Sequence, residues 1–366
     1  MKFETEVNPL PVLTWAWLRM NKAHLAEDLG CKKSGSVFEA KGLEKGARLS
    51  QKGALSESGG AKKNSMPGAL GKNFDELIFN NASAAVLEIP AGVKIEEPIT
   101  LRLKLNDGEA AFNSLEINAG PGSEATVIIE WTSEKNAHGL NASQTKITAQ
   151  ENARIKVSTV QLLGTGFVHL NDIATSGGEN STAQVAQLEL GAKKSFFGAY
   201  STLEAPLSRF VHNAAYFADG EREFDMNFVA LQKGKKSQCL MNVYGTLKDS
   251  AKKTYRGTID FKKGCEGAVG NELEDTLLLS PSVANKSIPL ILCDEENVQG
   301  EHGATIGRLD ESVLFYMNSR GISLEEAQKM AAKSKIARVA SEIGDMSEAQ
   351  KALDFFDQTF FGGEAL

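Results

Sequence analysis

Residues Tyr255–Phe261 read YRGTIDF, so that apolar or small residues alternate with polar ones at every second position. The same alternation occurs in Phe224–Phe228, which read FDMNF, and in Arg154–Ser158, which read RIKVS. Successive side chains of a β-strand point to opposite faces, and this period of two is therefore typical of a strand with one buried and one wet face. The pattern predicts a chain built mainly from short β-strands.

The strand pattern recurs from about Phe74 to Asn297 in short bursts that are broken by Gly, Asn and Asp. No long helical pattern interrupts it, which excludes a Rossmann-like sheet or a TIM barrel, because both need crossover helices. A sandwich, a barrel and a β-solenoid remain, and the residues alone do not separate them because no strict repeat motif is present. A solenoid would have roughly ten coils of about 20 residues each.

The ends of the chain differ from this core. Thr14 predicts the start of an N-terminal helix that runs to Leu29 and ends at Gly30, within a segment 1–30. Residues 31–73 are rich in Gly, Ser and Lys and predict a mobile connector, because they bury little apolar surface. The β core is expected over residues 74–307.

A C-terminal helical segment is predicted over residues 308–366. Asp310 can cap a first helix that ends at Gly321, and Ser323 with Glu326 forms a capping box for a second helix to Ile343. A third helix is expected to begin at Ser347 and to end at Gly362-Gly363, with apolar residues along one face.

The composition and charge of the chain exclude several classes of function. The chain has 366 residues, of which 42% are hydrophobic and 24% charged, and its formal net charge is -7. A negative surface repels nucleic acid and anionic lipid, and we expect neither as a partner. Residues Met1–Glu6 lack the basic start of a secretory signal, and no apolar run reaches the length of a membrane span. The four cysteines are widely spread without a C-x-x-C pair, and we expect reduced thiols in a cytoplasmic protein.

Motifs for catalysis are missing from the sequence. Residues Gly68–Asn73 contain Gly-Lys, but they lack the first glycine spacing and the Ser or Thr of a phosphate-binding loop. There is no G-x-S-x-G elbow, no H-E-x-x-H and no Cys-His pair placed for nucleophilic work. No catalytic residue is therefore assigned, and we expect a protein that is not an enzyme.

Several motifs occur together in the C-terminal half, in a fixed order and spacing. They are Tyr255–Ile259 (YRGTI), Leu277–Ser280 (LLLS), Asn297-Val298, Glu301–Asp310 (EHGATIGRLD) and Leu314–Ser323 (LFYMNSRGIS). This set resembles the core signature of the SufB/SufD family of iron–sulfur cluster assembly proteins. The opening Leu10–Asn21 (LPVLTWAWLRMN) is similar to the start of SufD-type chains, and the stretch Asn271–Leu277 lacks the cysteine of SufB-type chains. The resemblance is therefore to a SufD-like subunit.

The resemblance implies a fold and a set of partners. The fold would be a right-handed parallel β-helix, that is a β-solenoid core, with a short N-terminal and a C-terminal helical segment. The chain would be a scaffold subunit that pairs its last coils with a SufB-type subunit in a heterodimer and docks a SufC-type ABC ATPase on its C-terminal helices. ATPase activity would come from that partner. An iron–sulfur cluster would be held transiently at the partner interface, with none bound by the isolated chain, which could pair with itself as a homodimer through exposed strand edges.

The resemblance also implies site residues. His302 matches the histidine of the family's H-G-A-T motif, and with Glu301 it would face the cluster-forming interface, where His302 is a candidate metal ligand. Many SufD-type chains have a cysteine two residues before that histidine, but this chain has Gly300 there. ATPase docking is expected around four residues of the C-terminal helices, namely Phe315, Tyr316, Arg320 and Glu326.

Several of the candidate residues also have an interpretation without a functional role. A single loop histidine is most often an ordinary polar residue, and Cys265 and Cys293 fit small buried core residues better than ligands. Asp294–Glu296 could bind a cation but fits a solvated turn better. The alternative function is a carbohydrate-acting or carbohydrate-binding β-solenoid, which the absence of an export signal and of a catalytic carboxylate pair disfavours.

Overall fold

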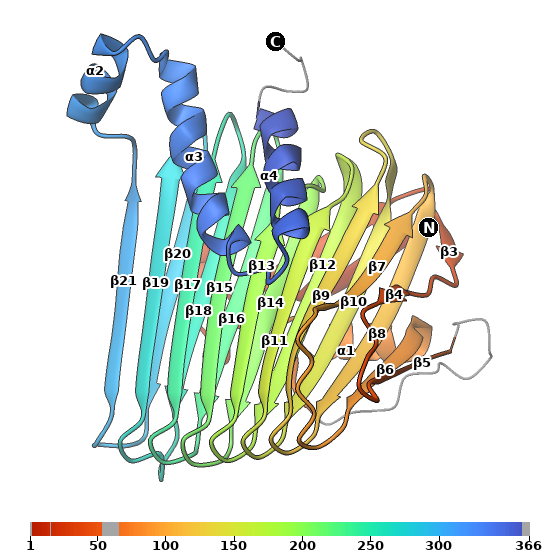
Figure 1. The fold of residues 1–366 in the computed structure, drawn as a ribbon. Helices are drawn as coiled ribbons and strands as arrows, with labels where there is room; N and C mark the ends of the chain where they lie inside the picture. Colours follow the sequence, from red (N-terminus) through yellow and green to blue (C-terminus); the bar gives the residue numbers. More distant parts are fainter. Residues whose placement is uncertain (1, 15, 53–65, 361–366) are drawn as a thin grey trace.

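The protein is a β-solenoid whose coils each contribute one strand to each of two facing sheets (Figure 1). The computed structural model describes residues 2–14, 16–52 and 66–360. One sheet contains the even-numbered strands β6 (Ser83–Ile89), β8 (Glu109–Ala119), β10 (His138–Ala149), β12 (Gly166–Gly177), β14 (Lys194–Leu203), β16 (Glu223–Gln232), β18 (Lys252–Phe261) and β20 (Ala284–Cys293). The other contains the odd-numbered strands β7 (Ile99–Leu105), β9 (Glu124–Ser133), β11 (Arg154–Leu162), β13 (Thr182–Glu189), β15 (Arg209–Ala218), β17 (Gln238–Leu247), β19 (Val269–Leu278) and β21 (Gln299–Gly307). The expected solenoid fold is confirmed.

Each strand pairs in parallel with the strand one coil further along the same sheet. Asn242 on β17, for example, donates a hydrogen bond from Nδ2 to Asn213 Oδ1 on β15, 29 residues earlier. The two sheets comprise eight such coils, whereas the sequence predicted about ten shorter ones. The coil estimate was too high because most strands have about ten residues rather than the shorter bursts that the alternation shows.

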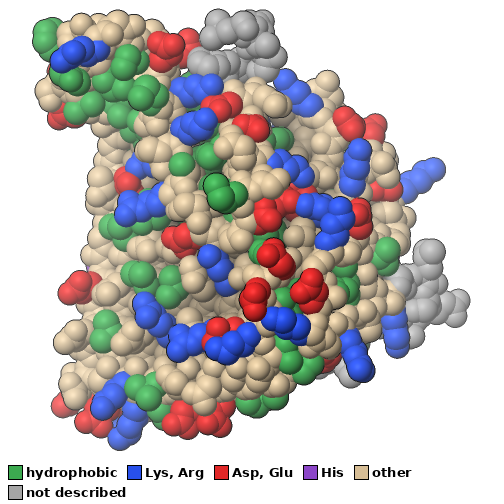
Figure 2. Space-filling model, in the orientation of Figure 1, with side chains coloured by type: hydrophobic (Ala, Val, Ile, Leu, Met, Phe, Trp, Pro, Cys, Tyr) green, Lys and Arg blue, Asp and Glu red, His purple; other side chains and the backbone are tan. Residues whose placement is uncertain are grey.

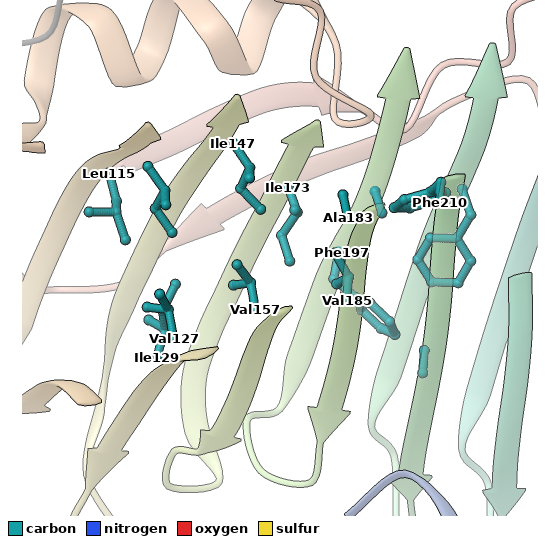
Figure 3. Packing of buried hydrophobic residues seen from close by; sticks show 14 of the residues in the cluster. Leu115, Val127, Ile129, Ile147, Val157, Ile173, Ala183, Val185, Phe197 and Phe210 are labelled. Atoms are coloured by element: carbon teal, nitrogen blue, oxygen red, sulfur yellow. The ribbon is translucent and has the colours of Figure 1, made fainter. Parts of the chain in front are cut away.

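The main hydrophobic core fills the space between the two sheets (Figure 3). Every second residue of a strand points into it, as Val127, Val157 and Val185 do on successive strands of the odd-numbered sheet. Parallel in-register pairing stacks these side chains along the solenoid axis. Burial of this continuous apolar column is the main stabilising contribution to the fold, at roughly 25 cal/mol per Å² of apolar surface removed from water.

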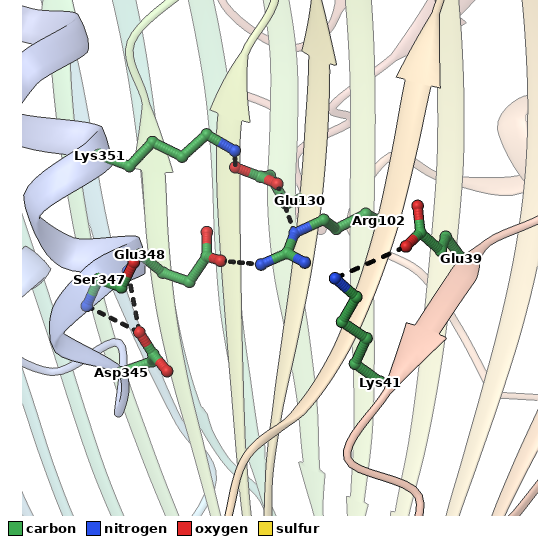
Figure 4. A network of polar contacts seen from close by, with 8 residues as sticks. All are labelled: Glu39, Lys41, Arg102, Glu130, Asp345, Ser347, Glu348 and Lys351. Carbon is green, nitrogen blue, oxygen red and sulfur yellow. Dashed lines mark hydrogen bonds and ion pairs between the residues drawn. The ribbon is translucent and has the colours of Figure 1, made fainter.

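Two C-terminal helices cover the outer face of the odd-numbered sheet. They are α3 (Leu324–Ala340) and α4 (Met346–Phe360), whose Ile336 and Phe356 pack with Phe217 of β15 in a second buried cluster. Polar contacts add to this packing (Figure 4): Arg102 donates to Glu130 at 3.1 Å and also contacts Glu348 of α4. These two helices and the preceding α2 (Glu311–Ser319) confirm the expected C-terminal helical segment. The expected stop at Gly362-Gly363 lies outside the described residues.

The N-terminal part covers the outer face of the even-numbered sheet and differs from the prediction. Strands β1 (Lys2–Val7) and β2 (Ala23–Asp28) pair antiparallel, and in the described residues between them the one helical element is the 3-10 helix η1 (Ala16–Leu18). The predicted helix from Thr14 to Leu29 is therefore wrong. The backbone N–H and the hydroxyl of Thr14 both donate to Asn21 Oδ1 at 2.7 Å, which closes a loop instead of capping a helix.

The predicted connector 31–73 is partly regular structure. Short strands β4 (Glu39–Lys41) and β5 (Arg48–Lys52) pair with β7 and β6 of the first coil, and β3 (Lys32–Ser34) pairs with β8 of the second coil. Residues 53–65 of the predicted mobile segment lie outside the described residues. Helix α1 (Lys72–Asn81) then precedes the first core strand, and none of the helices in the described ranges is long and apolar enough to cross a membrane.

Candidate functional site

The two ends of the solenoid differ. At the first coil, β5 pairs antiparallel with β6 and β4 pairs antiparallel with β7, which covers the strand edges. At the last coil, no further strand in the described part of the chain pairs with β20 or β21. No residue of β20 is fully buried, and all residues of β21 except Gly307 are exposed. This open end therefore presents two strand edges with free hydrogen-bonding capacity.

His302 and Glu301, the two expected interface residues, both lie on β21 at this open end and both are exposed. The register pairs His302 with Glu272 and Glu301 with Asn271 of β19. Glu272 is buried on the inner face of the solenoid. Because paired residues of parallel strands share a face, His302 lies on the inner side and Glu301 on the outer side.

Glu272 lies beneath this position with one oxygen bonded and one not. Tyr255 donates its hydroxyl hydrogen to Glu272 Oε1 at 2.8 Å, whereas Glu272 Oε2 has no hydrogen-bond partner within the described residues. A Cβ atom on Gly257 would lie 2.0 Å from Oε1, so only glycine leaves room for this carboxylate. Burial raises the pKa of Glu272 to about 7, against the opposing effect of the Tyr255 hydrogen bond.

A second buried acid neighbours the first on the same face of β19. Glu274 forms an ion pair with Lys253 and accepts a hydrogen bond from the hydroxyl of Ser287. Thr276 donates to Glu274 Oε1 at 3.2 Å and is itself 3.1 Å from the hydroxyl of Tyr216. The interior of the last coils therefore holds charged and polar groups beside the apolar residues of the core.

The sequence analysis did not single out Glu272 or Glu274. In Glu272-Leu273-Glu274 the two acids point inward and Leu273 is 37% exposed, which is the reverse of the usual apolar-in pattern. The residues at alternate positions around Glu272 and Glu274 could have shown that both acids point inward. Gly270 and Thr276 share their parity, and the buried Tyr255 and Ile259 lie across the interior.

The four cysteines divide into three buried thiols and one exposed thiol. Burial raises the pKa of Cys31 and Cys265, and that of Cys239 to about 12, so these three side chains are protonated near neutral pH. The prediction that Cys265 is a small buried residue is confirmed. The same prediction for Cys293 is wrong, because this residue ends β20 at the open end of the solenoid and is exposed.

The expected ATPase-docking residues lie on a projection beyond the open end. Helix α2 has no buried residue, and Phe315 and Tyr316 are 77% and 58% exposed. Figure 2 shows hydrophobic side chains gathered on this projecting part, which Figure 1 identifies as α2 and the start of α3. Arg320 lies 5.3 Å from the ring centre of Tyr316, and Glu326 accepts hydrogen bonds from the backbone and hydroxyl of Ser323 in the predicted capping box.

A groove of about 820 Å³ lies elsewhere, between α4 and the ends of β7, β9 and β11. Its charged lining includes Lys104, which pairs with Glu134 at 3.3 Å, and Lys351, which contacts Glu130. The groove belongs to the first coils and is separate from the open end. Within the described ranges, no three His, Cys, Asp or Glu side chains are placed to hold a metal ion.

The sequence matches the family described as SUF system FeS cluster assembly, SufBD core domain, over residues 102–334. The chain belongs to the SufBD family. The matched region spans most of the solenoid, the open end, α2 and the first part of α3. The fold and the position of His302 therefore lie within the part of the chain that defines the family.

Individual SufBD relatives agree with this assignment. The iron–sulfur cluster assembly protein SufD of Bacillus subtilis is 25% identical over 263 residues, which cover 71% of this chain and 60% of that protein. The SufB protein of the same organism is 22% identical over 275 residues, covering 72% and 57%. A SufBD family protein of Synechocystis is 25% identical over 281 residues, covering 74% and 58%. The match spans about three fifths of the length of these relatives, and the resemblance to a SufD-like chain is confirmed.

Proposed function

We propose that this chain is a SufD-like scaffold subunit that binds a SufB-type subunit at its open end and a SufC-type ABC ATPase on its C-terminal helices. The observation that carries the proposal is the asymmetry of the solenoid: short antiparallel strands cover the first coil, whereas β20 and β21 are exposed at the last coil. Unpaired strand edges of this length favour pairing with another chain, and natural proteins rarely leave them bare without a partner.

The partner at the open end is a second solenoid of the same family. Edge strands of two related solenoids have the same spacing of backbone donors and acceptors, so they can continue each other's sheets. A homodimer of this chain would use the same edges and is the competing assembly in the absence of a SufB-type subunit. A SufB-type subunit is favoured over a second copy of this chain. As a member of the same family it would end in strands of the same spacing, but with different residues on them.

The iron–sulfur cluster is cargo at this interface, held transiently between the subunits. His302 supplies an exposed imidazole there and Glu301 an exposed carboxylate from the opposite face of β21. The protonated thiols of Cys31, Cys239 and Cys265 are poor sulfur ligands, because the thiolate is the form that binds iron. Apart from the exposed Cys293 at the end of β20, sulfur ligands would therefore come from the partner.

The ATPase docks on α2 and the start of α3. Exposed aromatic side chains next to an arginine, as in Phe315, Tyr316 and Arg320, are the residue types that dominate binding energy in protein interfaces. Glu326 contributes by fixing the first turn of α3 through its capping box. In this proposal the chain has no catalytic residue of its own, ATP hydrolysis belongs to the partner, and the complex works in the cytoplasm.

Co-expression with SufB-type and SufC-type partners tests this function. Affinity purification, followed by assays of ATPase activity, iron and acid-labile sulfide, should give a stable complex that carries all three. His302→Ala should lower the iron and sulfide content without dissolving the complex, whereas His24→Ala on strand β2, which lies outside the strands of the open end, should change neither. Failure to bind either partner under reducing, low-salt conditions would contradict the scaffold function, and an unchanged cluster yield in His302→Ala would contradict the assigned site.

A further inference from the structure

The N-terminal loop (residues 8–14 and 16–21) is held at both ends on the outer face of the even-numbered sheet. At its start, Asn8 donates from Nδ2 to Asp225 Oδ1 of β16 at 2.7 Å. At its end, Arg256 of β18 donates to the carbonyl oxygen of Met20. Both anchors are buried, and β18 pairs directly with β20, the edge strand of the open end. The loop is therefore fixed one strand away from that edge.

The side chains of the loop divide into a buried and an exposed set. Leu10 and Met20 are buried, whereas Leu13 is 78% exposed, Trp17 is 75% exposed and Val12 is also exposed. Single exposed apolar residues are common on protein surfaces, but three within six positions of one anchored loop are typical of a contact surface. Because the loop is anchored at both ends, little conformational entropy is lost when a partner covers these side chains.

The outer face of β20 is also apolar and only partly covered. Its residues Ile288, Leu290 and Leu292 are half-buried, and they point outward because Ile291 packs against the main core between the sheets. Ile288 pairs with Arg256, whose side chain is buried on the same face. Covering of the outer face therefore decreases from β18 to β20, at the edge where a partner strand would pair.

We propose that the N-terminal loop is a second contact surface for the SufB-type subunit, beside the bare edge of β20. In the complex, Val12, Leu13 and Trp17 pack on the outer face of the partner strand that pairs with β20. Large apolar and aromatic side chains of this kind supply most of the binding energy where a partner excludes water from them. This inference rests on the proposed function, and it adds a surface from the N-terminal part of the chain to the open end.

The spacing of strands brings such a partner strand within reach of the loop. Adjacent strands lie about 4.8 Å apart, so a strand added to β20 lies about 10 Å from β18. An extended chain spans about 3.3 Å per residue, and roughly three to four residues cover this distance from the anchor at Met20. Trp17 precedes Met20 by three residues and Leu13 by seven. The loop therefore reaches the partner strand without leaving its anchors.

The test uses the purified complex of this chain with its SufB-type subunit. The photoreactive residue p-benzoylphenylalanine at position 13 reports which chain lies beside the loop, and a binding titration gives the dissociation constant of the two subunits. Leu13→Glu places a charge in the proposed contact, and the high exposure of Leu13 in the free chain leaves the fold intact. The matched control is position 43, where Leu43 is 39% exposed between β4 and β5 at the first coil and receives the same two changes.

Light should crosslink position 13 to the SufB-type subunit, whereas position 43 should give no crosslink to it. Leu13→Glu should raise the dissociation constant at least about tenfold and leave the melting temperature of the free chain unchanged, and Leu43→Glu should change neither. A stable complex with no crosslink from position 13, and with unchanged affinity in Leu13→Glu, would overturn the inference and leave the proposed function standing. A crosslink from position 13 to a second copy of this chain in that complex would also overturn it. If the two subunits do not associate, the proposed function fails and the loop contact fails with it.

Discussion

Arg256 on β18 donates a hydrogen bond from Nε to the carbonyl oxygen of Met20, 236 residues earlier in the chain, at 2.6 Å. The same guanidinium forms an ion pair with Asp225, and Asn8 donates to the carboxylate of Asp225 at 2.7 Å. Arg256 is only 1% exposed. The N-terminal loop is thus fixed on the even-numbered sheet by a buried ion pair close to the last coil.

Arg256→Met should lower the free energy of unfolding by about 3–5 kcal/mol, because it leaves Asp225 buried without its cation. Urea denaturation measures this loss, and limited proteolysis should show new cleavage within residues 10–21. Arg209→Met, at an exposed position on β15, should stay within about 0.5 kcal/mol of the wild type. A loss below about 1 kcal/mol together with a protected loop would show that the ion pair does not hold the N-terminal segment.

The alternation of residues predicted the strands of the core, and the capping box of Ser323 and Glu326 predicted the start of α3, because both signals are local. The arrangement of the strands in a solenoid was expected only from the family resemblance. The prediction of an N-terminal helix was wrong because Thr14 bonds to Asn21 and because Ala23–Asp28 pairs with β1. That pairing is a contact between residues far apart in the sequence. The predicted number and length of the coils were wrong for a related reason. Buried polar residues such as His169 interrupt the apolar pattern within strands that continue through them.

The site was predictable in part. His302 lies on the last strand of the core, as its position in the sequence implies, but its pairing with the buried Glu272 depends on the register between β19 and β21, and no local pattern specifies that register. The exposure of Cys293 likewise follows from the absence of a further covering strand among the described residues. The exposed edge strand β20 carries apolar residues up to Cys293, so it resembles a core strand in sequence until the neighbouring strands are known.

Glu189 and His169 form a neutral contact inside the solenoid. Their Oε1 and Nε2 atoms are 3.8 Å apart, and both side chains are fully buried. Burial raises the pKa of Glu189 to about 8 and lowers the pKa of His169 to about 3. At neutral pH the acid is mainly protonated and the imidazole is uncharged, so this contact is not an ion pair.

The raised pKa of Glu189 predicts how stability depends on pH. Its stabilising contribution is fully present below the unfolded-state pKa of about 4.5 and is lost as pH rises toward 8, because the unfolded chain then releases the proton more easily. Between pH 5.5 and 8 the wild type should therefore lose on the order of 2–3 kcal/mol relative to Glu189→Gln, which does not titrate. The lowered pKa of His169 acts in the other direction, and only below about pH 6.5.

Denaturant unfolding of both proteins at several pH values checks this difference. Glu179→Gln, on an exposed turn, is the control and should follow the wild-type pH profile. Parallel profiles for the wild type and Glu189→Gln would mean that Glu189 titrates in the native state much as it does in the unfolded chain.

Because the aromatic residues of α2 are exposed, we expect their substitution to weaken ATPase binding without lowering the stability of the protein. Phe315→Ser combined with Tyr316→Ser should weaken binding of the SufC-type ATPase by about 30-fold or more, in line with the loss of about 2 kcal/mol at interface hot spots. Because no residue of α2 is buried, the melting temperature should change by less than about 2 °C. The control is Met346→Ser, which removes another exposed apolar side chain, 91% exposed, at the start of α4. Equal ATPase binding by the double variant and this control would place the docking surface elsewhere.

Cys293 should be the thiol that reacts fastest in the native protein. It is exposed at the end of β20, where its Sγ–H donates to the carbonyl oxygen of Glu295 at 3.0 Å, whereas Cys31, Cys239 and Cys265 are buried. With a thiol reagent such as Ellman's reagent, one equivalent should react quickly and three should react only as the protein unfolds. Cys293→Ser should remove the fast phase and leave the slow one.

The rate of Cys293 modification also shows whether a partner covers the open end. If a SufB-type subunit covers β20, the rate of Cys293 modification should fall at least about tenfold in the complex, since the reagent reaches the thiol only after dissociation. The SufC-type ATPase alone, which in our proposal binds α2, should leave the rate unchanged. A Cys293 rate that is equal in the free chain and in a stable complex would place the partner contact away from β20, and it would require another role for the bare strand edges.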